Sequence, residues 1–200
     1  MPDTLLTPKG IAQCKEVAST FPPTEIHEIE LLAASPLRRA TYTAIHAFPD
    51  VTKRGLKILA LPEAQETGAG LKPCDTGSDL DMLMKEFHGH PVDLSLVSTG
   101  WNARHDHAAD SEAFRARGLI VRRWLKDRKE NVICLVTHGG FLHYLTEDWN
   151  GFDEKRGTAW ANCEWRTYEF KDTLNGSDDH NATLVEFRES RARRLEHDTT

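Results

Sequence analysis

The stretch Val132–Phe141 constrains the fold of this chain more than any other. It begins with apolar and β-branched residues, too few for a buried helix, and it closes on Thr137-His138-Gly139-Gly140. Such a run is typical of a central strand in a parallel sheet. A helical pattern from Phe141 to Glu147 follows at once, and the two glycines allow the backbone to turn sharply. The pattern predicts an α/β fold with His138 at the carboxyl edge of the sheet.

An anion site is one interpretation of His138 and Gly139 at this edge. Ligands of open α/β sheets bind outside the carboxyl ends of the strands. Free N–H groups at a helix N-terminus favour phosphate and other anions. The alternative is a strand-end histidine whose ring is satisfied by backbone partners. The residues of this stretch alone leave both interpretations open.

A second strand-to-helix junction follows the predicted buried strand Glu30–Ala34. Ser35 is suited to cap the next helix, and Pro36 fits its first turn. Arg38 and Arg39 then fall in that turn, where cations oppose the helix dipole unless an anion offsets them. The alternative is a solvated pair of arginines beside surface carboxylates. We favour anion binding.

The remaining pattern predicts a single domain over residues 1–187, followed by a charged tail over 188–200 that frays. A helix begins at Pro8 with Thr7 as its cap, and another runs from Asp110 or Ser111 to about Asp127. The second helix carries one apolar stripe. The other predicted elements are a strand over 57–61, a helix from Ser78 to about Phe87, and strands over 165–170 and 182–187.

Composition excludes several classes of protein. A net charge of -6 over 200 residues argues against sequence-independent nucleic-acid binding, which needs many cations. The four cysteines are widely spaced and form no paired motif, which suits a reducing compartment. The sequence shows no signal-peptide pattern and no run long enough to span a bilayer. We therefore expect a cytoplasmic or nuclear protein without a membrane partner.

Two further groups of side chains could carry chemistry. Glu66 or Glu63, in the long loop after residue 62, could serve as a general acid if burial raised its pKa, although solvated loop carboxylates are commoner. Four histidines, His88, His90, His105 and His107, lie near Asp106 and Asp110. Their spacing matches no metal signature. We predict no metal and no cofactor.

Taken in order, several motifs resemble the histidine phosphatase superfamily, the phosphoglycerate mutase-like proteins. They are Ser35-Pro36-Leu37-Arg38-Arg39-Ala40 with Thr43-Ala44, Gln65-Glu66, Pro73-Cys74-Asp75-Thr76-Gly77-Ser78, and Thr137-His138-Gly139-Gly140-Phe141-Leu142. The Cys-Asp-Thr-Gly-Ser block and Trp101-Asn102 are similar to the branch common in fungi. The resemblance implies a three-layer α/β/α sandwich.

The resemblance also implies roles for individual residues. His138 corresponds to the second histidine that binds the phosphoryl group, Arg39 to the arginine of the second motif, and Glu66 to the acid, with Glu63 in reserve. Gly139 would contribute a backbone N–H to the substrate. The expected activity is phosphomonoester hydrolysis on a small phosphorylated molecule, with specificity determined by the loop from His88 to Asp110.

The family's first strand, which ends in an Arg-His-Gly motif with the nucleophilic histidine, has no match in this chain. The segment Leu5–Gly10 resembles the residues just downstream of that motif. His27 and His46 lie in the wrong setting to replace the nucleophile. Covalent catalysis needs an aligned nucleophile, and the sheet would lose a central strand. The chain is a fragment of an active enzyme, a pseudo-phosphatase that binds or regulates without turnover, or an enzyme with redirected chemistry.

Overall fold

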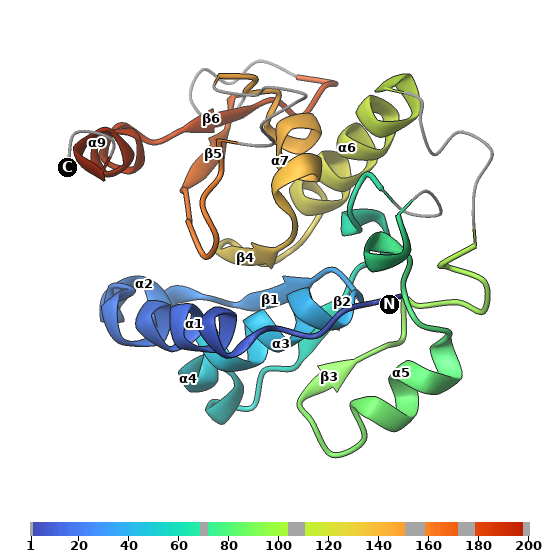
Figure 1. Ribbon diagram of the computed structural model, residues 1–200. Helices are drawn as coiled ribbons and strands as arrows, with labels where there is room; N and C mark the ends of the chain where they lie inside the picture. The colour runs from blue at the N-terminus through green and yellow to red at the C-terminus, as the bar shows by residue number, and fades with distance from the viewer. Residues whose placement is uncertain (1, 69–71, 104–110, 151–158, 172–178, 198–200) are drawn as a thin grey trace.

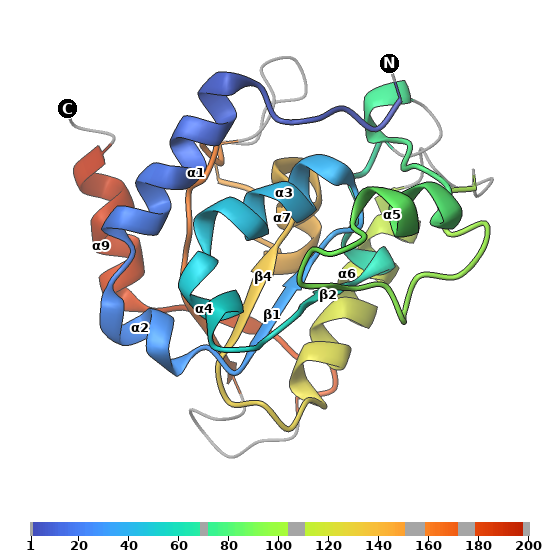
Figure 2. The ribbon, with the colours of Figure 1, turned by 90° about the horizontal axis from the view of Figure 1, so that it is seen from below.

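The computed structural model describes residues 2–68, 72–103, 111–150, 159–171 and 179–197. Four strands form a parallel sheet in the order β3-β2-β1-β4: β1 (Leu31–Ala34), β2 (Ile58–Ala60), β3 (Val92–Asp93) and β4 (Ile133–Val136). In Figure 2, β2, β1 and β4 lie side by side. A separate antiparallel pair consists of β5 (Tyr168–Phe170) and β6 (Leu184–Glu186). The predicted α/β class is confirmed.

Helices cover both faces of the parallel sheet (Figure 1). On one face lie α1 (Pro8–Thr20), α2 (Pro23–Glu28), α3 (Arg38–Ala47) and α4 (Pro49–Lys53). Their apolar side chains pack with Leu32, Ala34 and Ile58 in one core cluster. On the other face lie α6 (Ser111–Lys126) and α7 (Gly139–Thr146), which pack around Phe141. The arrangement is therefore a three-layer sandwich.

The remaining elements are short. They are the 3-10 turns η1 (Pro62–Ala64) and η2 (Pro73–Asp75), the helix α5 (Leu80–Glu86), and the C-terminal helix α9 (Arg188–His197). None of the helices in the described ranges is long and apolar enough to cross a membrane.

The predicted central position of β4 is wrong. β4 pairs with β1 from Ile133 to Val136, and among the described residues no strand pairs with its other edge. All four residues of β1 are buried, whereas those of β4 are only partly buried. The apolar run of β4 is suited to a strand with neighbours on both sides. Sequence pattern alone cannot distinguish that from an edge.

The starts of two helices also differ from the prediction. α3 begins at Arg38 rather than near Pro36, because the Ser35 hydroxyl accepts a hydrogen bond from Leu37 N while the Asp3 carboxylate accepts one from Arg38 N at 2.9 Å. α5 begins at Leu80 after Asp79, so Ser78 does not cap it.

The charged tail expected to fray from Arg188 is a helix as far as His197. The Ser190 hydroxyl accepts a hydrogen bond from Thr167 N and donates one to Glu186, which connects α9 to β5 and β6. Because the contact with Thr167 joins residues 23 positions apart, the charge pattern of the segment gave no signal for it.

Candidate functional site

The predicted site residues Arg39, Glu66, His138 and Gly139 all line one cavity at the carboxyl edge of the sheet. His138 follows β4 and occupies the N-cap position of α7. Arg39 lies in the first turn of α3, and Glu66 follows η1. Parallel strands end at a common edge, so three distant segments meet there.

His138 is buried, with 7% of its surface exposed. Its Nε2 has no hydrogen-bond partner among the described residues. Burial lowers the pKa of His138 well below its usual value, and the charges of Arg39 and Arg117 lower it further. The ring is therefore neutral at pH 7, and it lies in a positive field.

Arg39 is anchored beside the cavity by the Cys-Asp-Thr-Gly-Ser loop. One guanidinium nitrogen donates to Cys74 O at 2.6 Å, and another donates to Asp75 Oδ1 at 2.9 Å. A guanidinium carries five N–H donors, so these bonds leave donors for a ligand. Arg38 points elsewhere: it pairs with Glu86 at 2.9 Å and contacts Asp3. Arg38 therefore pairs with a carboxylate, as the alternative predicted, and its role is structural.

Trp101 and Asn102 stabilise the loop that holds Arg39. Trp101 Nε1 donates to Ser78 O at 3.1 Å, and Asn102 Nδ2 donates to Gly77 O at 2.7 Å. A Cβ at Gly77 would lie 2.3 Å from the Trp101 ring, so only glycine fits. Trp101 and Asn102 therefore do not contact Arg39 directly but hold in place the Cys-Asp-Thr-Gly-Ser loop that anchors it.

Glu66 caps α7 and does not project freely into the cavity. Its Oε1 accepts hydrogen bonds from Thr67 N at 2.8 Å and Phe141 N at 3.0 Å, and its Oε2 lies 3.4 Å from Gly140 N. The carboxylate occupies the helix N-terminus at which we predicted an external anion. Glu63, the reserve acid, lies in η1, and its charge, like that of Glu66, offsets part of the lowering of the Arg117 pKa by burial.

Arg117, on α6, is a neighbour of the site that the sequence analysis missed, and its charge lowers the pKa of His138. It donates to Gln65 O at 2.9 Å, and its guanidinium lies 4.6 Å from the centre of the Phe141 ring. Burial lowers its pKa to about 10, so it remains charged. Arg117 Nε is buried and has no hydrogen-bond partner within the described ranges. A cation three residues after Phe114, within the apolar stripe of the helix, was the available signal.

The histidines considered for metal binding do not join this site. His88 and His90 are exposed near the end of α5, whereas His105 and His107 lie outside the described residues. Within the described ranges, no group of three or more histidine, cysteine or acidic side chains could hold a metal ion.

Comparison with known proteins identifies the family. The family model of the histidine phosphatase superfamily (branch 1) matches residues 1–183. Phosphoglycerate mutase-like protein 1 of Arabidopsis thaliana is 30% identical over 211 residues, covering 88% of this chain and 73% of that protein. A second Arabidopsis thaliana phosphoglycerate mutase-like protein is 25% identical over 217 residues, covering 90% and 78%. Phosphoglycerate mutase-like protein 2 of the same plant is 29% identical over 117 residues, covering 55% of this chain but only 34% of its own length. The chain belongs to the histidine phosphatase superfamily.

Proposed function

We propose that the chain binds the phosphoryl group of a small phosphorylated molecule between His138, Arg39 and Arg117, with Gly139 beside it. The observation that carries the proposal is that two buried nitrogens near the cavity, His138 Nε2 and Arg117 Nε, have no hydrogen-bond partner among the described residues. A buried polar group without a partner costs about 1–3 kcal/mol. A phosphate oxygen would supply the missing partner, and its charge would offset two nearby guanidinium groups.

By family, the expected reaction is phosphomonoester hydrolysis, with Glu66 as the acid. His138 is the one histidine among the described residues that line the cavity. A route through a phosphohistidine needs a second, aligned imidazole. We infer that the chain as given binds phosphate but turns over slowly, as a fragment or as a pseudo-phosphatase. The Cys74–Ser78 block with Trp101 supports the fungal-type branch.

A non-catalytic, regulatory binding protein is the second candidate. The Glu66 carboxylate is held by backbone N–H groups at the start of α7, which keeps it from acting freely as an acid. Asp75 likewise forms an ion pair with Arg39 and uses part of its hydrogen-bonding capacity. A site whose charges are already paired suits reversible binding more than proton transfer. On either reading we expect a cytoplasmic or nuclear protein.

Phosphate titration tests the proposal. The imidazole resonances of His138 should move toward the protonated form as phosphate rises through the millimolar range, because the anion stabilises the imidazolium. Arg39→Ala should weaken binding by about 1.5–3 kcal/mol, the range for hydrogen bonds to charged groups. No movement of these resonances at saturating millimolar phosphate would overturn the proposal.

A matched pair of variants on α6 separates the site from general charge effects. Arg117→Met should weaken phosphate binding, because it removes a partly buried cation whose charge acts on His138. Arg115→Met removes an exposed cation from the same helix and should leave binding within twofold. Equal losses in both variants would indicate nonspecific attraction. Thermal unfolding of each variant checks that the fold is intact.

A further inference from the structure

Asp3 lies in the segment ahead of α1, and only 1% of its surface is exposed. An aspartate is seldom buried to this extent unless its carboxylate is hydrogen-bonded or paired. Its backbone lies in the left-handed region, with a φ of 46°. Asp and Asn adopt that conformation more readily than most residues, and it persists where the surrounding contacts hold it. Both features indicate that specific interactions fix Asp3 in place.

The Asp3 carboxylate joins two segments that are far apart in the sequence. Its Oδ1 accepts a hydrogen bond from Arg38 N, and its Oδ2 accepts one from Ser78 N, both at 2.9 Å. Arg38 begins α3, whereas Ser78 ends the Cys-Asp-Thr-Gly-Ser loop, residues 74–78. Each oxygen serves a different segment, so the bridge needs two acceptors on one side chain.

The backbone of Asp3 contacts the same two segments. Asp3 N donates to Pro73 O at 3.2 Å, and Asp3 O accepts from Arg38 Nη1 at 3.4 Å. In Figure 2 the segment ahead of α1 runs to the turns that precede α5. Asp3 therefore holds the loop at both ends, at Pro73 and at Ser78.

The loop residues between these two contacts hold the guanidinium of Arg39. Cys74 O accepts a hydrogen bond from it at 2.6 Å, and Asp75 Oδ1 accepts one at 2.9 Å. Arg39 also follows Arg38 directly in the chain, so its backbone is fixed by the other contact of the carboxylate. Asp3 thus fixes both the acceptors of the guanidinium and the backbone from which that side chain extends.

The orientation of a guanidinium decides how well it binds a phosphoryl group. Its planar set of N–H donors matches phosphate oxygens only in restricted geometries. An arginine side chain has several rotatable bonds, and ordering them on binding weakens affinity unless the protein has ordered them beforehand. An Arg39 that is held before the ligand arrives should therefore bind phosphate more tightly than a mobile one.

We propose that Asp3 is a positioning residue, which holds the Arg39 guanidinium in the orientation that binds a phosphoryl group. The first part, the orientation of Arg39, rests on the four hydrogen bonds of Asp3. The second part, the effect on phosphate, also rests on the proposed function. The two parts are tested separately below.

Asp3→Asn isolates the carboxylate. Asn has nearly the same size and tolerates the same backbone conformation, but its side chain has one acceptor oxygen and an NH₂ donor. It can accept from Arg38 N or from Ser78 N, and not from both. In the ligand-free wild type, the Nη–H resonances of Arg39 should be resolved, whereas in Asp3→Asn they should average because the guanidinium rotates. Resolved Arg39 resonances in the variant would overturn the proposal.

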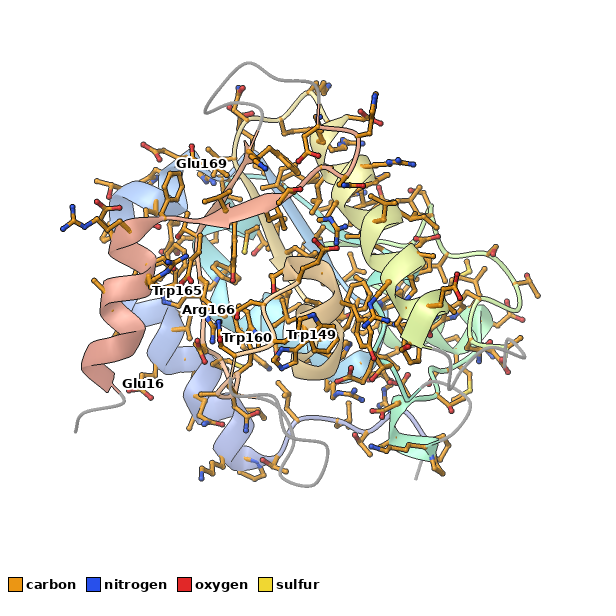
Figure 3. The ribbon with its side chains drawn as sticks, turned by 90° about the horizontal axis from the view of Figure 1, so that it is seen from above. Glu16, Trp149, Trp160, Trp165, Arg166 and Glu169 are labelled. Carbon is orange, nitrogen blue, oxygen red and sulfur yellow. The ribbon has the colours of Figure 1, made fainter. Side chains whose placement is uncertain are left out.

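Arg166 is the internal reference in the same spectra. It donates to Glu164 Oε1 at 2.6 Å and to Asp148 Oδ2 at 3.4 Å, so carboxylates hold this guanidinium as well. Figure 3 shows Arg166 on the segment between α9 and α7. Its resonances should stay resolved in Asp3→Asn. Averaging at Arg166 as well as at Arg39 would indicate general loosening of the fold and would overturn the proposal.

A double-mutant cycle with inorganic phosphate tests the second part. Asp3→Asn should raise the Kd for phosphate about tenfold, but by less than about twofold when Arg39→Lys is also present. Lysine carries a point charge and has no plane to orient. Equal effects in both backgrounds would show that Asp3 does not act through Arg39 and would overturn the proposal. A wild type that binds no phosphate would overturn the proposed function and this second part, while the Arg39 resonances would still test the first.

Val51→Ala is the control for lost stability. Val51 is fully buried in α4, in the core cluster that α1 to α4 form with the sheet. Its truncation destabilises the fold through a cavity and leaves the contacts of Asp3 in place. It should keep Arg39 resolved and change the Kd for phosphate by less than about twofold. A weakening as large as that of Asp3→Asn would make the effect one of stability and would overturn the proposal.

Amide exchange in the unmodified chain tests the bridge even if Asp3→Asn does not fold. Because one carboxylate accepts from both Arg38 N and Ser78 N, both amides should be protected in the ligand-free chain. Exchange of either amide at the rate of an unstructured peptide would show that the bridge does not form and would overturn the proposal.

Discussion

The carboxylate of Glu66 accepts a hydrogen bond from the backbone N–H of Phe141 at 3.0 Å, on the first turn of α7. A residue predicted as a proton donor therefore serves as a helix cap in this structure. The carboxylate also places a negative charge beside the proposed phosphate site. These two effects give Glu66 opposite influences on stability and on anion binding.

Glu66→Ala should destabilise the fold by about 0.5–2 kcal/mol, the range for loss of a helix cap. The same variant should bind phosphate more tightly, because it removes a nearby like charge. Urea unfolding and phosphate titration measure the two effects. Glu63→Ala is the control, because Glu63 caps no helix in the described structure, and it should change stability by less than about 0.5 kcal/mol. Weaker phosphate binding by Glu66→Ala would contradict this account.

The local sequence pattern predicted the helices and strands that build the site. The features that it missed depend on contacts between residues far apart in the sequence. The Thr7 cap of α1 is confirmed, with Thr7 Oγ1 accepting from Gly10 N at 3.1 Å. The strand-Gly-Gly-helix pattern likewise placed His138 correctly at the start of α7. Both signals reside in a few neighbouring residues, where propensity and capping chemistry act.

The missed features depend on residues far apart in the sequence. Asp3 receives hydrogen bonds from Arg38 N and Ser78 N, which lie 35 and 75 positions away. The edge position of β4 depends on which segments lie beside it, and the apolar run carries no such information. Arg117 was missed because its role comes from burial against Phe141, on another helix.

Because of His138, the free energy of unfolding should decrease as the pH is lowered below about 6.5. Its pKa is lowered well below 6.5 in the folded chain, whereas in the unfolded chain the ring titrates near 6.5. Between the folded pKa and about pH 6.5, the imidazole of the unfolded chain binds a proton that the folded chain does not bind. The contribution of the neutral His138 ring to the free energy of unfolding is therefore complete above about pH 6.5 and is lost as the pH falls toward the folded pKa. The slope should approach about 1.4 kcal/mol per pH unit.

Urea unfolding of His138→Gln between pH 7.5 and 5 checks this effect, since the variant should lose that part of the slope. His88→Gln, at an exposed position, should retain it. Identical pH profiles for wild type and His138→Gln would show that His138 is not held neutral by burial.

Cys14 and Cys163 should form a disulfide under mild oxidation. Their sulfur atoms lie 3.8 Å apart, and a hydrogen bond from Cys163 lowers the pKa of Cys14 to about 6. Hydrogen peroxide should convert the Cys14 thiolate to a sulfenic acid. The Cys163 thiol then attacks the sulfur of that sulfenic acid, which forms the disulfide and releases water. Burial raises the pKa of Cys134 to about 12, so that thiol should remain reduced.

Peptide mapping after oxidation identifies the bond. Cys134→Ser should form it as the wild type does, whereas Cys14→Ser should not. A disulfide that includes Cys134, or sulfinic acid at Cys14 without a disulfide, would contradict the geometry of the pair.

Turnover should be low in the chain as given. Because a phosphohistidine route needs a nucleophile, hydrolysis of an activated phosphomonoester should reach no more than a small fraction of an intact relative's rate. Positioning by His138 and Arg39 could leave about 10³-fold over water, as in catalytic sites stripped of a nucleophile. The signature is slow hydrolysis without a covalent phosphoenzyme, tested with a labelled phosphoester. Joining a family first strand with its Arg-His-Gly motif ahead of Met1 should restore turnover, because it would supply the missing nucleophile. Fast turnover by the unmodified chain, unchanged in His138→Ala, would show that the site lies elsewhere.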